Sequence, residues 1–68
     1  MEQSPIHLTK REQQVLRLIH EGYTDSKISE QLNISQNTVR THRQNMRKKF
    51  KAKNTPDMLR KAAQQNFL

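Results

Sequence analysis

The side chains best suited to recognising another molecule gather between Gln31 and Pro56. This stretch of 26 residues contains no Asp or Glu. It holds seven basic residues: Arg40, Arg43, Arg47, Lys48, Lys49, Lys51 and Lys53. Outside it six basic and six acidic residues cancel, so the formal net charge of +7 arises from this stretch alone. A field of one sign confined to one segment attracts a polyanion, which favours nucleic acid over a merely solvated surface.

The same stretch has the periodicity of a two-faced helix. At 100° per residue, Val39, Met46 and Phe50 fall on one stripe, which indicates a core face. The opposite side carries polar and cationic residues: Asn37, Arg40, Thr41, Gln44 and Lys48. The spacing therefore predicts a helix over about 35–50 that packs on one side and presents hydrogen-bonding and charged groups on the other.

Three side chains on the polar face are of types that read base edges. Arg40 is the leading candidate because Arg bonds guanine O6 and N7 in a bidentate way. Its alternative role is a phosphate contact, which carries no sequence information directly. Gln44 can pair with adenine and Thr41 can touch a thymine methyl group, or each can simply line the surface.

Other groups suit the phosphate backbone. Free N–H groups in the first turn, near Ser35, Gln36 and Asn37, favour an anion. Arg47 and Lys48 lie further along the helix and are candidates for phosphate contacts. These residues would position a duplex, whereas the base readers would specify it.

Composition excludes several other classes of protein. The chain has 68 residues, no cysteine, one Gly and two Pro, so we expect one small all-α domain without a disulfide. His7, His20 and His42 lack metal-ligand spacing, and no cysteine can complete a site, so no metal or other cofactor is expected. No phosphate loop, nucleophile elbow or carboxylate pair indicates an enzyme. No apolar run is long enough to span a membrane.

Local signals predict four helices, over about 9–21, 25–32, 35–50 and 56–65. Thr9 and Glu12 have the spacing of a capping box, and Gly22 suits the left-handed residue that ends a helix. Thr24 and Ser35 are N-cap residues for the second and third helices.

The last two junctions carry their own signals. The three or four residues around Asn33–Ser35 have the length of a helix-turn-helix connection, which makes the third helix the recognition helix. Thr55, Pro56 and Asp57 read as a cap, a Pro at the first helical position and an acid in the first turn.

With these elements in place, the chain resembles the LuxR/FixJ/NarL-type DNA-binding domain over about residues 8–65. The resemblance is carried by Leu8-Thr9, Arg11-Glu12, Val15-Leu16, Gly22, Ile28-Ser29, Leu32, Ile34-Ser35, Thr38 to His42, Asn45-Met46 and Lys49-Phe50. It implies a four-helix bundle that binds double-stranded DNA, as the output domain of a two-component response regulator or a small stand-alone regulator. It also implies the bacterial cytoplasm, and RNA polymerase as a candidate partner.

The resemblance assigns roles to particular positions. Base contacts are implied for Arg40, Thr41 and Gln44. Backbone contacts are implied for Asn37, Thr38, His42 and later basic residues, to which we add Ser35, Arg47 and Lys48. A homodimer through the last helix is implied, with Met58, Leu59 and Ala62 as its expected face. For Lys49, an ion pair with Glu12 is favoured over a phosphate contact.

Several residues depart from the family pattern. Ser29 replaces a small Ala and is tolerable if its hydroxyl bonds a helix carbonyl. Asp25 replaces a common Asn and puts negative charge near the expected DNA side. Lys51 replaces Gly or Asn in the turn before the fourth helix. Arg43 and Arg47 flank the core stripe, where their stems can cover core atoms while their heads reach outward.

Two other functions compete with this reading. Region four of a sigma factor has a similar helix-turn-helix, although residues 41–46 and the fourth helix fit the LuxR type better. A basic amphipathic helix over 39–50 also resembles protein-interaction modules, but it has no Trp and one large aromatic residue, Phe50. We expect residues 1–7 to be a linker or leading segment and 8–68 to be the domain.

Overall fold

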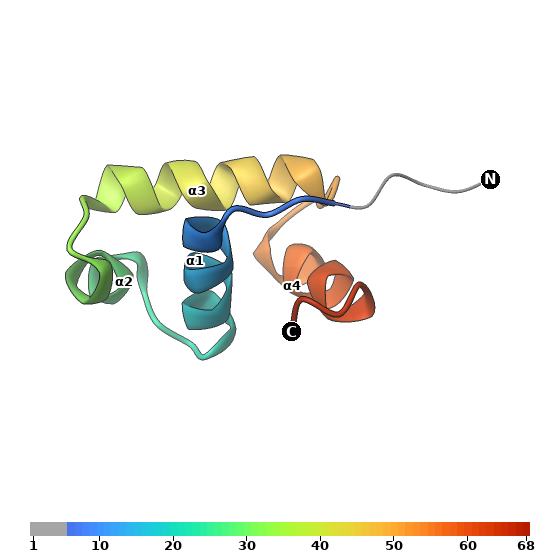
Figure 1. Ribbon diagram of the computed structural model, residues 1–68, viewed down its shortest axis with the longest axis horizontal. Coiled ribbons are helices and arrows are strands. Elements are labelled where there is room, and N and C mark those ends of the chain that lie inside the picture. Colours follow the sequence, from blue (N-terminus) through green and yellow to red (C-terminus); the bar gives the residue numbers. More distant parts are fainter. Residues whose placement is uncertain (1–5) are drawn as a thin grey trace.

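Four helices make up the computed structural model, which describes residues 6–68. They are α1 (Lys10–His20), α2 (Asp25–Leu32), α3 (Gln36–Lys49) and α4 (Thr55–Gln64), and no strand occurs in the described part. The longest helix, α3, contacts the other three, which lie together on one side of it (Figure 1). The predicted all-α fold with a helix-turn-helix formed by α2 and α3 is confirmed. Within residues 6–68, no helix has the length and apolar character needed to cross a bilayer.

Side-chain caps start the first three helices as predicted. Glu12 N–H donates to Thr9 Oγ1 and Thr9 N–H donates to Glu12 Oε1, each at 3.0 Å, so the capping box is complete. Thr24 accepts from Lys27 N–H at 3.2 Å, and Ser35 accepts from the third residue of α3 at 3.0 Å. These bonds satisfy N–H groups that have no partner within the helix.

The start of α4 corrects one prediction. Asn54, rather than Thr55, is the N-cap, and its Oδ1 accepts from Asp57 N–H at 2.9 Å. Asp57 reaches back and accepts from Lys53 N–H at 3.0 Å. Starting the helix one residue earlier allows both bonds, and Asn is a stronger N-cap than Thr, so Thr55 becomes the first helical residue.

Each helix is followed by a residue in the left-handed conformation. These residues are Gly22, Asn33, Lys51 and Asn66, with φ of 97°, 56°, 55° and 68°. After each, the next N–H bonds a carbonyl five residues back, at 2.9–3.0 Å, in the pattern of a Schellman motif. Lys51 lacks the freedom of Gly at such a φ, and its carbonyl accepts from Lys61 Nζ at 2.8 Å.

The core lies between α3 and the helices beneath it. Its buried hydrophobic residues are Leu8, Val15, Leu16, Ile28, Val39, Met46, Phe50, Met58 and Ala62. The predicted stripe of Val39, Met46 and Phe50 is therefore confirmed as core. Phe67 closes the far end of this stripe by packing edge-on against Phe50, with ring centroids 5.6 Å apart.

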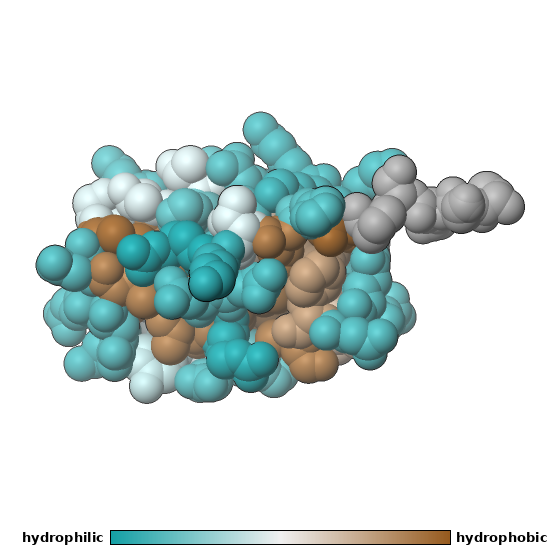
Figure 2. Space-filling model, in the orientation of Figure 1, coloured by the Kyte–Doolittle hydropathy of each residue, from teal (hydrophilic) through white to brown (hydrophobic). Residues whose placement is uncertain are grey.

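Two of the three expected dimer residues of α4 lie in the core of the domain. Met58 and Ala62, four residues apart, face the core and are fully buried, whereas Leu59 is half-buried and Ala63 is exposed. Figure 2 shows hydrophilic residues over most of one face, with hydrophobic residues mainly where α1 meets α2 and where α1 meets α4.

Two residues of the expected leading segment contact the domain. Ile6 packs against the core, and the carbonyl of His7 accepts a hydrogen bond from Lys49 Nζ at 2.9 Å. The remainder of that segment, residues 1–5, lies outside the described residues. The division into a lead and a domain stays a prediction.

Candidate nucleic-acid interface

The exposed side of α3 brings the predicted base readers together. Arg40, Thr41 and Gln44 are all exposed and lie within a little more than one turn of the helix. The preceding turn is ordered, because the Ser35 hydroxyl lies 2.9 Å from the Thr38 hydroxyl and Arg40 Nη1 donates to Asn37 Oδ1 at 3.4 Å. The first exposed turns of α3 therefore carry hydrogen-bonding side chains at defined positions.

Most of the predicted backbone contacts share this exposure. Ser35, Asn37, Thr38, Arg47 and Lys48 are exposed, and only His42 is half-buried. No acidic residue occurs in the first turn of α3, so the amide N–H groups there face no nearby carboxylate from their own helix. An unopposed helix N-terminus and later cations suit phosphates at separate points along a duplex.

The basic residues of α3 fall into two groups. Within residues 6–68, Arg40, Arg47 and Lys48 have no carboxylate within ion-pair distance, whereas Arg43 and Lys49 are paired. The unpaired cations lie on or beside the exposed face. Their charge therefore remains available to an approaching polyanion.

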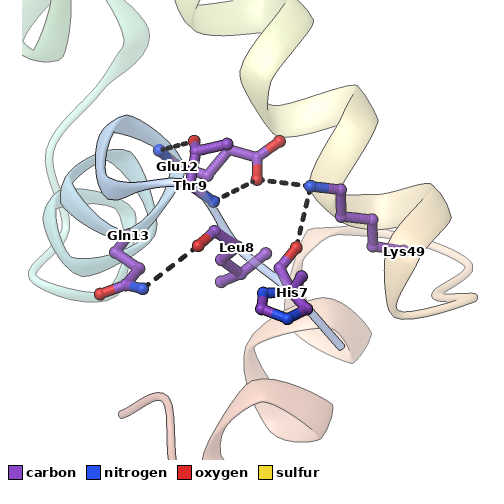
Figure 3. Close-up of polar contacts among 6 residues, drawn as sticks. All are labelled: His7, Leu8, Thr9, Glu12, Gln13 and Lys49. Carbon is purple, nitrogen blue, oxygen red and sulfur yellow. Dashed lines mark hydrogen bonds and ion pairs between the residues drawn. The ribbon is translucent and has the colours of Figure 1, made fainter. Parts of the chain in front are cut away.

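Lys49 is structural, as the favoured interpretation held. Its Nζ lies 2.7 Å from Glu12 Oε1 and also donates to the His7 carbonyl, so the end of α3 is tied to α1 and to the chain before it (Figure 3). Burial raises the pKa of Glu12, but the bonds from Lys49 and from Thr9 N–H, together with nearby His42, outweigh it. The pKa of Glu12 therefore lies below its usual value, and the carboxylate stays charged.

A second paired cation explains the unusual acid at the start of α2. Arg43 donates from Nη1 to Asp25 Oδ1 at 3.0 Å, and its Nη2 lies 3.0 Å from Oδ2. The negative charge that Asp25 brings near α3 is thus neutralised within the domain. The sequence indicated that the Arg43 head reaches outward, but it held no signal for this partner, 18 residues away.

Asp57 fixes the start of α4 beside the end of α3. The Lys53 N–H bond lowers the pKa of Asp57 against the opposing effect of burial, and Arg60 and Lys61 lower it further. The Arg60 guanidinium bonds Oδ1 and Lys61 Nζ lies 3.4 Å from Oδ2. Arg60 and Lys61 on α4 therefore pair with the carboxylate in the first turn of their own helix.

Ser29 makes the hydrogen bond that the sequence analysis required of it. Its hydroxyl donates to the Ser26 carbonyl at 2.6 Å, so the polar group that replaces a small Ala is satisfied inside α2.

Hollows on the surface of the described residues include two of note. One lies along the flank of α3 and is lined by Arg40, Arg43, Gln44, Arg47 and Thr55. The other lies between α1 and α2 and mixes polar residues with Leu18 and Leu32. Within residues 6–68 no group of three or more His, Cys, Asp or Glu side chains is placed to hold a metal ion.

The expected dimer residues are not equally accessible. Met58 and Ala62 have no exposed surface, because both lie in the core of the single domain. Leu59 is half-buried and retains some surface. Any partner that contacts α4 meets Leu59 and its exposed neighbours rather than the two core residues.

A short α2, a tight turn and a longer cationic α3 define a helix-turn-helix protein of the DNA-binding class. Residues 7–62 match the family model described as "Bacterial regulatory proteins, luxR family". The chain belongs to this family and is a LuxR-type DNA-binding domain of a transcription regulator, not an enzyme. The family match favours the LuxR type over the sigma-factor interpretation.

Individual relatives support this assignment. The chain is 42% identical over 53 residues to response regulator protein TmoT of Ectopseudomonas mendocina, covering 78% of the chain and 24% of that protein. It is 40% identical over 60 residues to transcriptional regulatory protein FixJ of Rhizobium meliloti, covering 88% and 29%. The chain thus spans about a quarter of the length of these curated relatives.

A solved structure has the same fold. A chain in the crystal structure of the phage VqmA–DPO complex superposes with a TM-score of 0.85 at 29% sequence identity. The match covers 91% of this chain and 28% of that one.

Proposed function

We propose that this domain binds duplex DNA in a sequence-specific way, with α3 in the major groove. The observation that carries the proposal is the exposed face of α3, where side chains of types that can bond base edges lie beside cations that have no carboxylate partner within residues 6–68. The major groove of B-DNA admits a helix, and each base pair presents a distinct pattern of donors and acceptors there.

The base readers we propose are Arg40, Thr41 and Gln44. Their exposure and their position early in α3 suit the end of a recognition helix that enters the groove. Ser35, Asn37, Thr38, His42, Arg47 and Lys48 would contact the sugar-phosphate backbone on either side. Half-buried His42 would do so only through its exposed edge.

We further propose a homodimer on DNA through α4. Leu59, Pro56 and Ala63 are spaced at three and four residues and retain exposed surface, so they form one strip along the helix. This strip takes the place of Met58 and Ala62 in the expected dimer face. Two copies would then read two half-sites at a spacing set by α4.

The wider setting follows from the relatives. TmoT and FixJ are named as a response regulator and a transcriptional regulatory protein, so we propose that the domain is the output unit of a similar regulator. Its place of action would be the bacterial cytoplasm, where the chromosome lies. RNA polymerase would be its second macromolecular partner, since regulators act on transcription by recruiting or excluding it.

Titration of the ¹⁵N-labelled chain with duplex DNA tests the binding face. We expect the largest amide shift changes at residues 35–48, and small changes around Gln14 and Gln31 in the hollow between α1 and α2. Largest changes in that hollow would contradict the proposal. Strong binding to vesicles of anionic lipid would instead favour the interaction-module alternative.

A further inference from the structure

Asp25, the first residue of α2, binds the guanidinium of Arg43 on α3 through both carboxylate oxygens. The two N···O distances are 3.0 Å, and the side chains are only 32% and 20% exposed for Arg43 and Asp25. A planar guanidinium that bonds a carboxylate in this two-pronged way has a fixed direction. Arg43 is therefore turned toward α2, rather than left free to follow a phosphate.

The position of Arg43 makes this pairing consequential. It lies three residues after Arg40 and four before Arg47, so the three guanidinium groups form one row on the flank of α3 and line the same hollow. Within the described chain, Arg40 and Arg47 have no carboxylate partner. The row therefore has one available cation on each side of a neutralised one.

We propose that Asp25 withholds Arg43 from the DNA backbone, so that the domain engages a duplex with one cation fewer than its arginine row contains. The inference rests on the proposed DNA-binding function and deepens it. Each cation that reaches a phosphate adds to sequence-independent, salt-dependent affinity through counterion release. Asp25 is thus a residue that limits non-specific binding.

Binding of the 68-residue chain to a random-sequence duplex over a range of salt concentrations tests this role. Asp25→Asn keeps the shape of the side chain but frees Arg43. We expect the plot of log affinity against log salt to steepen by about 0.9 per bound domain, with about eightfold tighter binding at 0.1 M salt.

Glu30→Gln is the matched control. It changes the net charge by the same amount on the same helix, but Glu30 is 68% exposed and pairs only loosely with Lys27, at 3.8 Å. We expect its salt slope to equal that of the unmodified chain. An equal steepening in Glu30→Gln would show that overall charge, not release of Arg43, causes the effect, and would overturn the proposal.

The variant Arg43→Gln tests whether Asp25 keeps Arg43 away from DNA or whether the pair only stabilises the fold. We expect an unchanged salt slope in Arg43→Gln, and a return to the original slope in the double variant Asp25→Asn with Arg43→Gln. A slope made shallower by about 0.9 in Arg43→Gln would show that Arg43 already contacts phosphate, and an unchanged slope in Asp25→Asn would equally overturn the inference. Either result leaves the proposed function intact, whereas failure of the unmodified chain to bind duplex at low salt would remove both.

Discussion

Arg40 decides whether α3 reads bases or only follows the backbone. It is exposed, and apart from Asn37 Oδ1 at 3.4 Å no polar partner within the described chain holds its guanidinium. We predict that Arg40→Ala weakens binding to a preferred duplex by about 1–3 kcal/mol and relaxes preference at one base pair. Affinities for a panel of single-base variants of that duplex measure both effects.

Arg40→Lys is the control for that measurement. Lys retains the charge but loses the fork that bonds guanine O6 and N7 together. Loss of preference in Arg40→Lys at nearly constant affinity for random duplex supports base reading. Uniform weakening of Arg40→Ala across the whole panel, with Arg40→Lys unaffected, would assign Arg40 to a phosphate.

Glu12 links stability to pH. Its pKa is lowered in the folded state, so the folded chain binds fewer protons than the unfolded chain as the solution becomes acidic. The stability that Glu12 contributes is therefore complete above its unfolded pKa and is lost as pH falls through its lower folded pKa. We predict a falling free energy of unfolding over that acidic range.

Glu12→Gln isolates this contribution from that of Asp57, whose pKa is also lowered. Gln can still complete the capping box with Thr9, but it neither titrates nor pairs with Lys49 as an ion. Denaturant unfolding of both chains should show a stability difference that shrinks as the pH falls below about 4. A difference that stayed constant with pH would contradict the role of the ion pair.

At the scale of the element, the start of α4 offers a direct comparison of two neighbouring residues. Asn54 caps the helix and Thr55 is already inside it. We predict that Asn54→Ala lowers the free energy of unfolding by about 1 kcal/mol, whereas Thr55→Ala changes it by less than about 0.5 kcal/mol. Chemical denaturation measures both; the reverse order would restore Thr55 as the cap.

The same junction shows how far sequence reasoning reaches. Caps and periodicity predicted the helix starts at Thr9, Thr24 and Ser35, because those signals act within three or four residues. The predicted start of α4 was wrong by one residue because Asn54 and Thr55 are both good caps, and the two bonds that favour Asn54, from Asp57 N–H and from Lys53 N–H, are seen only in the structure.

On the polar side of α3, too, some features could be predicted from the sequence and others could not. The exposed positions of Arg40, Thr41 and Gln44 follow from the core stripe on the opposite side of α3, so the sequence predicted them. The pairing of Arg43 with Asp25 depends on how α2 crosses α3, and no local pattern records that angle. The sequence predicted the ion pair of Lys49, but only the structure shows which other cations of α3 are paired and which remain available.

For the whole molecule, the proposed dimer places two copies of α3 on one duplex. We predict that Leu59→Asp reduces the number of chains bound per preferred element from two to one, because a charge would then occupy the strip on α4. Sedimentation of the complex measures this number. Gln13→Asp, an exposed position on α1, carries the same charge change and should leave it at two.

Leu59 also packs partly against the core, so the melting temperature of Leu59→Asp must be measured alongside. A folded Leu59→Asp chain that still binds as two copies would place the dimer contact elsewhere.

The central claim is that this small basic domain reads sequence rather than charge alone. Selection from a pool of random duplexes at near-physiological salt, with sequencing of the bound fraction, tests it most directly. We predict enrichment of a short element, present twice at a fixed spacing, and loss of preference at one position of each half-site for Arg40→Ala. A pool that binds without enrichment, and dissociates steeply as salt is added, would contradict the claim and leave only non-specific attraction to phosphate.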